Sequence, residues 1–74
     1  MMHFHFLFHD GSEIVFYAED CKHFTGHAAL SNAEITKNTK NNIPVGTKFL
    51  RFNIALNSDL FGMYPEVSEN EEKI

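Results

Sequence analysis

Four of the five histidines and the single cysteine are the residues of this chain whose spacing could do chemistry. His3 and His5 alternate along one extended segment, while His23 and His27 are four positions apart and would share one face of a helix. Cys21 lies two residues before His23. Because zinc accepts imidazole and thiolate ligands in a tetrahedral shell, all five residues are candidate metal ligands.

Neither a metal site nor a catalytic site has a recognisable motif around these residues. No Cys-x-x-Cys pair or familiar His/Cys spacing is present, so we expect no bound metal and no other cofactor. Cys21 could act as a nucleophile beside a histidine, but no nucleophile elbow or phosphate-binding glycine loop accompanies it. A lone cysteine is more often a small buried hydrophobe. We therefore predict no catalytic residues and no enzymatic activity.

The element that would position His3 and His5 is a strand over residues 2–9. Its phenylalanines alternate with its histidines, which is typical of a strand with one face on a core. Asp10-Gly11 favours a tight hairpin turn into a second strand over residues 12–18. Two registers stay open: a two-residue turn places Phe16 on the histidine face, whereas a bulge at Gly11 pairs Phe16 with the phenylalanine face.

Residues 20–37 are predicted to form one interrupted helical region. Asp20 could cap the helix, and Ser31 to Glu34 have the spacing of a second capping box. The competing interpretation is two strands, His23–Leu30 and Ala33–Asn38, in an all-β, barrel-like module.

The remainder of the chain is predicted to form a loop and two further strands. Residues 38–46 are rich in asparagine, proline and glycine, which indicates a loop. The strand over residues 47–56 would direct four alternating side chains to the core: Leu50, Phe52, Ile54 and Leu56. A short last strand, Leu60–Tyr64, would end at Pro65.

The predicted fold is therefore a single α+β domain over residues 1–65, in the order ββαββ. Its interrupted helical region would pack on one face of an antiparallel sheet. The strand over 47–56 is placed beside the strand over 2–9. Residues 66–74 would form an acidic, flexible tail. The alternative is an all-β small barrel.

Composition narrows the function. The net charge is −4, and the six Lys and Arg residues are scattered, which disfavours nucleic-acid binding. The aromatic and basic residues around Phe49 keep a single-stranded nucleic-acid-binding module as an alternative. One cysteine, no signal peptide and no apolar run long enough for a bilayer indicate a cytoplasmic protein.

Eight phenylalanines in 74 residues give the predicted sheet more apolar surface than one short helix can cover. Surplus apolar surface on a sheet favours an interface. We predict a small protein-binding module, either a homodimer or a binder of a larger target, that uses His3, His5, Leu7 and Phe16. In size and acidity this chain compares with the small accessory proteins of phages and mobile elements. Many of those proteins are stoichiometric inhibitors or adaptors, and the comparison is one of class alone. A His/Cys metal-binding protein remains an alternative.

Overall fold

The structure is a computed structural model that describes residues 1–66. Six strands form one antiparallel sheet, and none of the residues it describes is helical. The strands are β1 (Met2–Phe8), β2 (Glu13–Ala18), β3 (Asp20–Phe24), β4 (His27–Asn38), β5 (Lys48–Ala55) and β6 (Leu60–Glu66). Their order is β3-β4-β2-β1-β6, and β5 pairs with β4.

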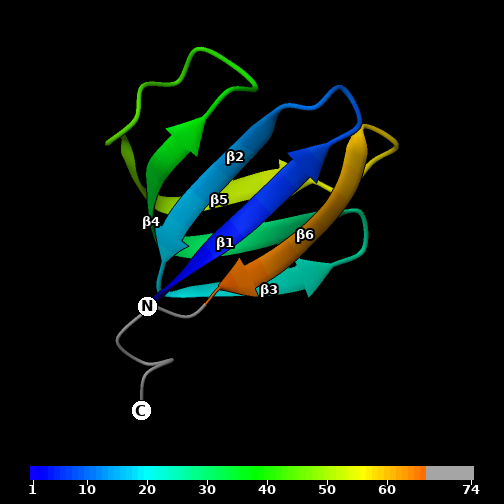
Figure 1. The fold of residues 1–74 in the computed structure, drawn as a ribbon. Coiled ribbons are helices and arrows are strands. Elements are labelled where there is room, and N and C mark those ends of the chain that lie inside the picture. The colour runs from blue at the N-terminus through cyan, green and yellow to red at the C-terminus, as the bar shows by residue number, and fades with distance from the viewer. Residues whose placement is uncertain (67–74) are drawn as a thin grey trace.

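The sheet curls into a half-barrel. Figure 1 shows β2, β1 and β6 crossing in front of β3, β4 and β5. The long strand β4 connects the two layers, because its first half pairs with β3 and its second half with β2. The core lies between the layers. Its buried side chains include Phe4, Phe6, Phe8, Ile14, Phe16, Leu30, Ile35 and Ile54.

The prediction of an α+β fold is wrong, and the all-β alternative fits. Residues 20–37 form the β3–β4 hairpin, which turns at Gly26 with a φ of 85° that glycine adopts at low cost. Asp20 and Ser31, predicted to start helices, lie opposite each other in this hairpin. The strand alternative was right in kind, but the break falls at Gly26, within its first predicted strand. Local capping signals were overridden by cross-strand pairing.

A kink in β4 explains a second error. Asn32 has a φ of 49°, a left-handed conformation that asparagine tolerates better than most residues. The inward-facing residues therefore change parity there, from Ala28 and Leu30 to Ala33 and Ile35. The paired strand β5 follows the same change.

Strand β5 forms where it was predicted, but one of its side chains faces the other way. Ile54 is buried, and Phe52 and Leu56 pack against the core as expected. Leu50 is 85% exposed instead, while Phe49 packs against the core. The alternation of inward and outward side chains in β5 is therefore interrupted at the residues that lie opposite Asn32 of β4.

The first hairpin adopts the register with a bulge at Gly11. Phe4 pairs with Phe16, and Phe6 pairs with Ile14. The Gly11 amide donates to the Phe8 carbonyl at 3.0 Å, and Gly11 has a φ of 89°. This is the arrangement of a three-residue loop with a glycine bulge, and it puts Phe16 in the core.

Strand β1 lies inside the sheet, flanked by β2 and β6. The predicted neighbour, the strand over 47–56, pairs with β4 instead. Pro65 does not end the last strand, which continues to Glu66; proline is tolerated because β6 is an edge strand. Apart from Glu66, the predicted acidic tail lies outside the described residues. No helix in the described part of the chain is long and apolar enough to cross a membrane.

Candidate functional site

The side of β2, β1 and β6 that points away from the core forms one continuous surface, called here the outer face. The strand registers place three cross-strand rows on it: Tyr17–His3–Glu66, Val15–His5–Tyr64 and Glu13–Leu7–Gly62. The alternation of β1 produces this surface, because every second side chain of a strand points to the same face. The predicted residues His3, His5 and Leu7 therefore do lie together.

His5 is at the centre of this face and is held from three sides. Its Nε2 atom lies 2.7 Å from Glu66 Oε1, and its Nδ1 atom lies 3.3 Å from Glu13 Oε2. The ring of Tyr64 stacks on the imidazole, with centroids 4.5 Å apart and planes 4° from parallel. Only 14% of the His5 side chain is exposed. The imidazole is thus a fixed part of the surface and can bridge two carboxylates when protonated.

Glu13 links this histidine to the neighbouring strand. Lys37 Nζ lies 2.9 Å from Glu13 Oε1, so the carboxylate has a partner on each oxygen. The hydrogen bond from Lys37, followed by that from His5, lowers the pKa of Glu13. Val15 is only 4% exposed although it is on the outer face, since its cross-strand neighbours are His5 and Lys37. The middle of the face is therefore ordered and partly desolvated.

Two exposed aromatic side chains lie along β6. Tyr64 is 44% exposed, and Phe61 is 68% exposed. Phe61 occupies the irregularity where the β1–β6 register shifts, and its ring meets that of His9 at 5.3 Å, nearly perpendicular. Neither side chain is used by the core. Tyrosine and phenylalanine in such positions are enriched in protein interfaces.

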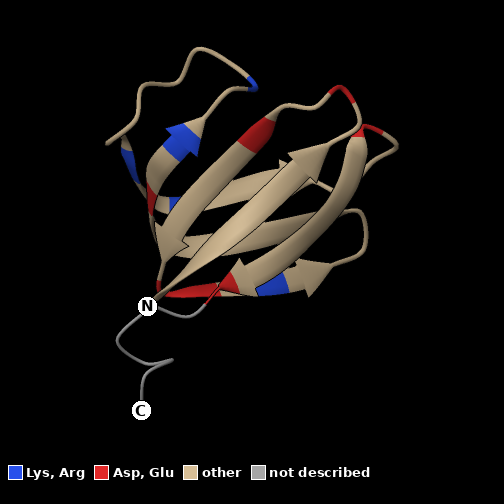
Figure 2. Ribbon diagram, in the orientation of Figure 1, with Lys and Arg blue, Asp and Glu red and all other residues tan. Residues whose placement is uncertain are grey.

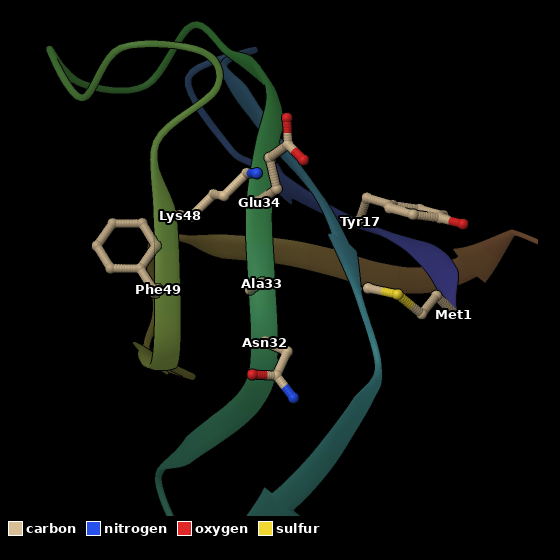
Figure 3. A pocket seen from close by; sticks show the side chains of 7 residues that line it. All are labelled: Met1, Tyr17, Asn32, Ala33, Glu34, Lys48 and Phe49. Atoms are coloured by element: carbon tan, nitrogen blue, oxygen red, sulfur yellow. The ribbon is translucent and has the colours of Figure 1, made fainter.

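A pocket of about 310 Å³ adjoins the outer face at Tyr17. The Tyr17 ring contacts the His3 ring at 4.8 Å, so the pocket and the histidines share one border. Figure 3 shows Glu34 and Lys48 side by side on the neighbouring strands, and Phe49 on the opposite side of β5. A hollow next to a surface tyrosine could accept a protruding side chain from a partner.

Charged residues are arranged around the outer face rather than across it. Strand β1 contains no lysine, arginine, aspartate or glutamate. Figure 2 accordingly shows it without colour, with acidic segments at the start of β2 and the end of β6. Depletion of charge at the centre with charge at the border is typical of an interface.

Phe16, the fourth residue predicted for the binding surface, is not on this face. It is fully buried and packs against Phe6 and Phe52, with centroid distances of 5.8 and 5.0 Å. Its placement follows from the bulge at Gly11, which shifts β2 by one residue relative to a two-residue turn.

The remaining candidate metal ligands lie on β3 and β4. His23 contacts the sulfur of Met63 at 3.1 Å, and His27 stacks on Phe24 at 5.1 Å. Burial, with a smaller effect of the Asp20 carboxylate, raises the pKa of the Cys21 thiol, which lowers its reactivity. No group of three His, Cys, Asp or Glu side chains in residues 1–66 is placed to hold a metal ion.

Sequence reasoning missed Tyr64 and Phe61. The predicted strand Leu60–Tyr64 contained both, but its pairing partner could not be assigned. Pro65 was interpreted as the end of this strand, whereas its presence reflects the position of the strand at the edge of the sheet. Once β6 is paired with β1, the aromatic residues take their place beside the histidines.

Comparison of the chain with protein-family models, curated proteins and solved structures gives no match. Function must therefore be inferred from the side chains of the outer face.

Proposed function

We propose that this protein is a small, non-enzymatic protein-binding module that acts through the outer face and the adjoining edge of β6. The observation that carries the proposal is the pair of exposed aromatic side chains, Tyr64 and Phe61, packed on the imidazoles of His5 and His9. Aromatic side chains of this kind offer a large apolar contact area and lose little conformational entropy when a partner binds.

The edge of β6 adds a second means of recognition. Within the described sheet, β6 is a terminal strand that pairs only with β1. An unpaired edge offers main-chain donors and acceptors to a further strand. Pro65 removes one of those donors, so the edge near Phe61 to Tyr64 is its most useful part.

The partner we propose first is a second copy of the chain. A domain of 74 residues buries a modest core and commonly gains stability from a partner subunit. Six large apolar side chains are exposed among residues 1–66: Met1, Phe24, Val45, Leu50, Phe61 and Tyr64. A larger target protein, bound as by a stoichiometric inhibitor or adaptor, is the alternative partner for the same face. The free Cys21 supports a reducing, cytoplasmic location.

The test is sedimentation of the wild-type chain at micromolar concentration beside two matched variants. Tyr64→Glu places a charge in the outer face, whereas Leu50→Glu places the same charge at the most exposed apolar residue, on β5. We expect a dimer that Tyr64→Glu dissociates and Leu50→Glu leaves intact. If the wild type is a monomer of 8.5 kDa, self-association is excluded and a separate target must be sought.

A further inference from the structure

A second hollow, which shares no residue with the pocket beside Tyr17, lies between β5 and the loop of residues 39–47. Its volume is about 220 Å³. The bottom is apolar, formed by Ile14 and Ile54, which are 3% and 8% exposed, together with Phe8 and Phe52. The rim is polar and includes three asparagines, Lys40 and Asp59. An apolar bottom with a few polar groups around it is the usual form of a small-ligand site.

The loop that forms one wall is fixed by its own side chains. Asn38 Oδ1 accepts hydrogen bonds from the amides of Lys40 and Asn41, at 3.0 and 3.1 Å. The Nδ2 group of Asn38 donates to Asn41 Oδ1 at 2.6 Å and to the Ile43 carbonyl at 3.0 Å. The wall is thus organised before any ligand arrives, which reduces the entropy cost of binding.

The same bonds decide which end of each rim amide is free. Asn41 Oδ1 accepts from the amide of Ile43 at 3.2 Å, and Asn57 Oδ1 accepts from the amide of Asp59 at 3.0 Å. A backbone amide can only donate, so the oxygen of each asparagine must face it. The Nδ2 groups of Asn41 and Asn57 bond no acceptor within residues 1–66, so they can donate to a ligand.

Lys40, the one cation of the rim among the described residues, is already paired with carboxylates. Lys40 Nζ lies 3.3 Å from Asp10 and 3.6 Å from Asp59, and it sits 4.6 Å from the centre of the Phe8 ring. An anionic ligand would meet the Asp59 carboxylate as well as a lysine whose charge is already paired. A cationic ligand would meet amide donors and the lysine. The rim therefore favours an uncharged ligand.

We propose that this hollow binds a small, uncharged molecule with an apolar body and carbonyl oxygens as acceptors. The apolar body would occupy the bottom near Ile54 and Phe52, and the carbonyls would accept hydrogen bonds from Asn41 and Asn57. The volume is below the range that holds drug-sized ligands, so the ligand is the size of a single capped amino acid.

Three probes with the same leucine side chain and different charges test this proposal: N-acetyl-leucinamide, its near-isosteric anion N-acetyl-leucine, and the cation leucinamide, which also lacks the acetyl carbonyl. Each is titrated into nitrogen-15-labelled protein, with two-dimensional NMR spectra recorded at every step. We expect saturable shifts of the side-chain amide signals of Asn41 and Asn57 with N-acetyl-leucinamide. We expect the charged probes to bind at least about threefold more weakly, because the rim charges oppose them and because leucinamide also lacks the acetyl carbonyl.

Two variants with the same charge change provide the control. Asn57→Asp removes one of the two proposed donors, keeps the oxygen that accepts from the Asp59 amide, and should weaken binding of N-acetyl-leucinamide. Asn42→Asp makes the same change at an exposed loop residue outside the hollow and should leave binding unchanged. The proposal is overturned if the wild type shows no saturable shifts at these amides, if the anion binds most tightly, or if both variants behave alike.

Discussion

Replacement of Phe16 by alanine tests the assignment of inner and outer faces most severely. The side chain is completely buried and makes ring contacts with Phe6 and Phe52 at 5.8 and 5.0 Å. Removal of a buried phenylalanine typically costs about 3–5 kcal/mol, since both the transfer free energy and the cavity contribute. A chain of 74 residues has about 4–11 kcal/mol of stability in total, so Phe16→Ala should remove a large part of it.

The matched control is Phe61→Ala, which removes the same atoms from a side chain that is 68% exposed. Its free energy of unfolding should change by less than about 1 kcal/mol. Urea denaturation followed by circular dichroism measures both variants. With a typical slope of about 1 kcal/mol per molar urea, Phe16→Ala should lower the midpoint by about 3–5 M. Equal losses for the two variants, or a loss below about 1 kcal/mol for Phe16→Ala, would refute the register of the first hairpin.

Three further outcomes are expected. The pKa of Glu13 is lowered in the fold, so its ion pairs stabilise the protein above the ordinary pKa of 4.5, and this stability is lost as the pH falls through the lower folded pKa. Denaturation at neutral and acid pH should therefore show a larger acid loss in the wild type than in Glu13→Gln, which keeps the loss that is due to Asp10. Asn32→Ala should destabilise the fold by about 1 kcal/mol in urea denaturation, because alanine is poorly suited to a φ of 49°; an unchanged midpoint would argue against the kink. Iodoacetamide should alkylate Cys21 more slowly in the folded protein than in urea, because burial raises the thiol pKa; equal rates would show that the thiol is accessible.

Local sequence patterns predicted those elements whose signals agree with their pairing. The alternation of Phe4, Phe6 and Phe8 was sufficient for β1, and the turn residues around Gly11 were sufficient for a hairpin. The strand over 47–56 also appeared where expected. For β1 both the strand and its two faces are determined within one short segment, whereas for β5 the local pattern determines the strand and not all of its inward-facing residues.

The errors arose where distant pairing decides the outcome. Capping signals at Asp20 and Ser31 favoured a helix, but these two residues face each other across a hairpin. Parity in β5 changes because of a kink at Asn32, which lies on a different strand. The outer face likewise depends on the pairing of β6 with β1, which brings Tyr64 to His5 from 59 positions away in sequence. No local pattern contains that information.

Part of the candidate site was therefore accessible from the sequence. His3, His5 and Leu7 follow from the alternation of one strand. Phe16 was assigned to this surface by one of two open registers, and the glycine bulge selects the other. The exposed aromatic residues of β6 required the tertiary structure.

The most direct test of the outer face as a protein-binding surface is the sedimentation mass of the wild type beside Tyr64→Glu and Leu50→Glu. We expect a wild-type mass twice that of the 8.5 kDa chain, a monomer for Tyr64→Glu and a dimer for Leu50→Glu. A dimer that Leu50→Glu dissociates while Tyr64→Glu does not would contradict the outer face as the binding surface, and a wild-type monomer would exclude self-association through it.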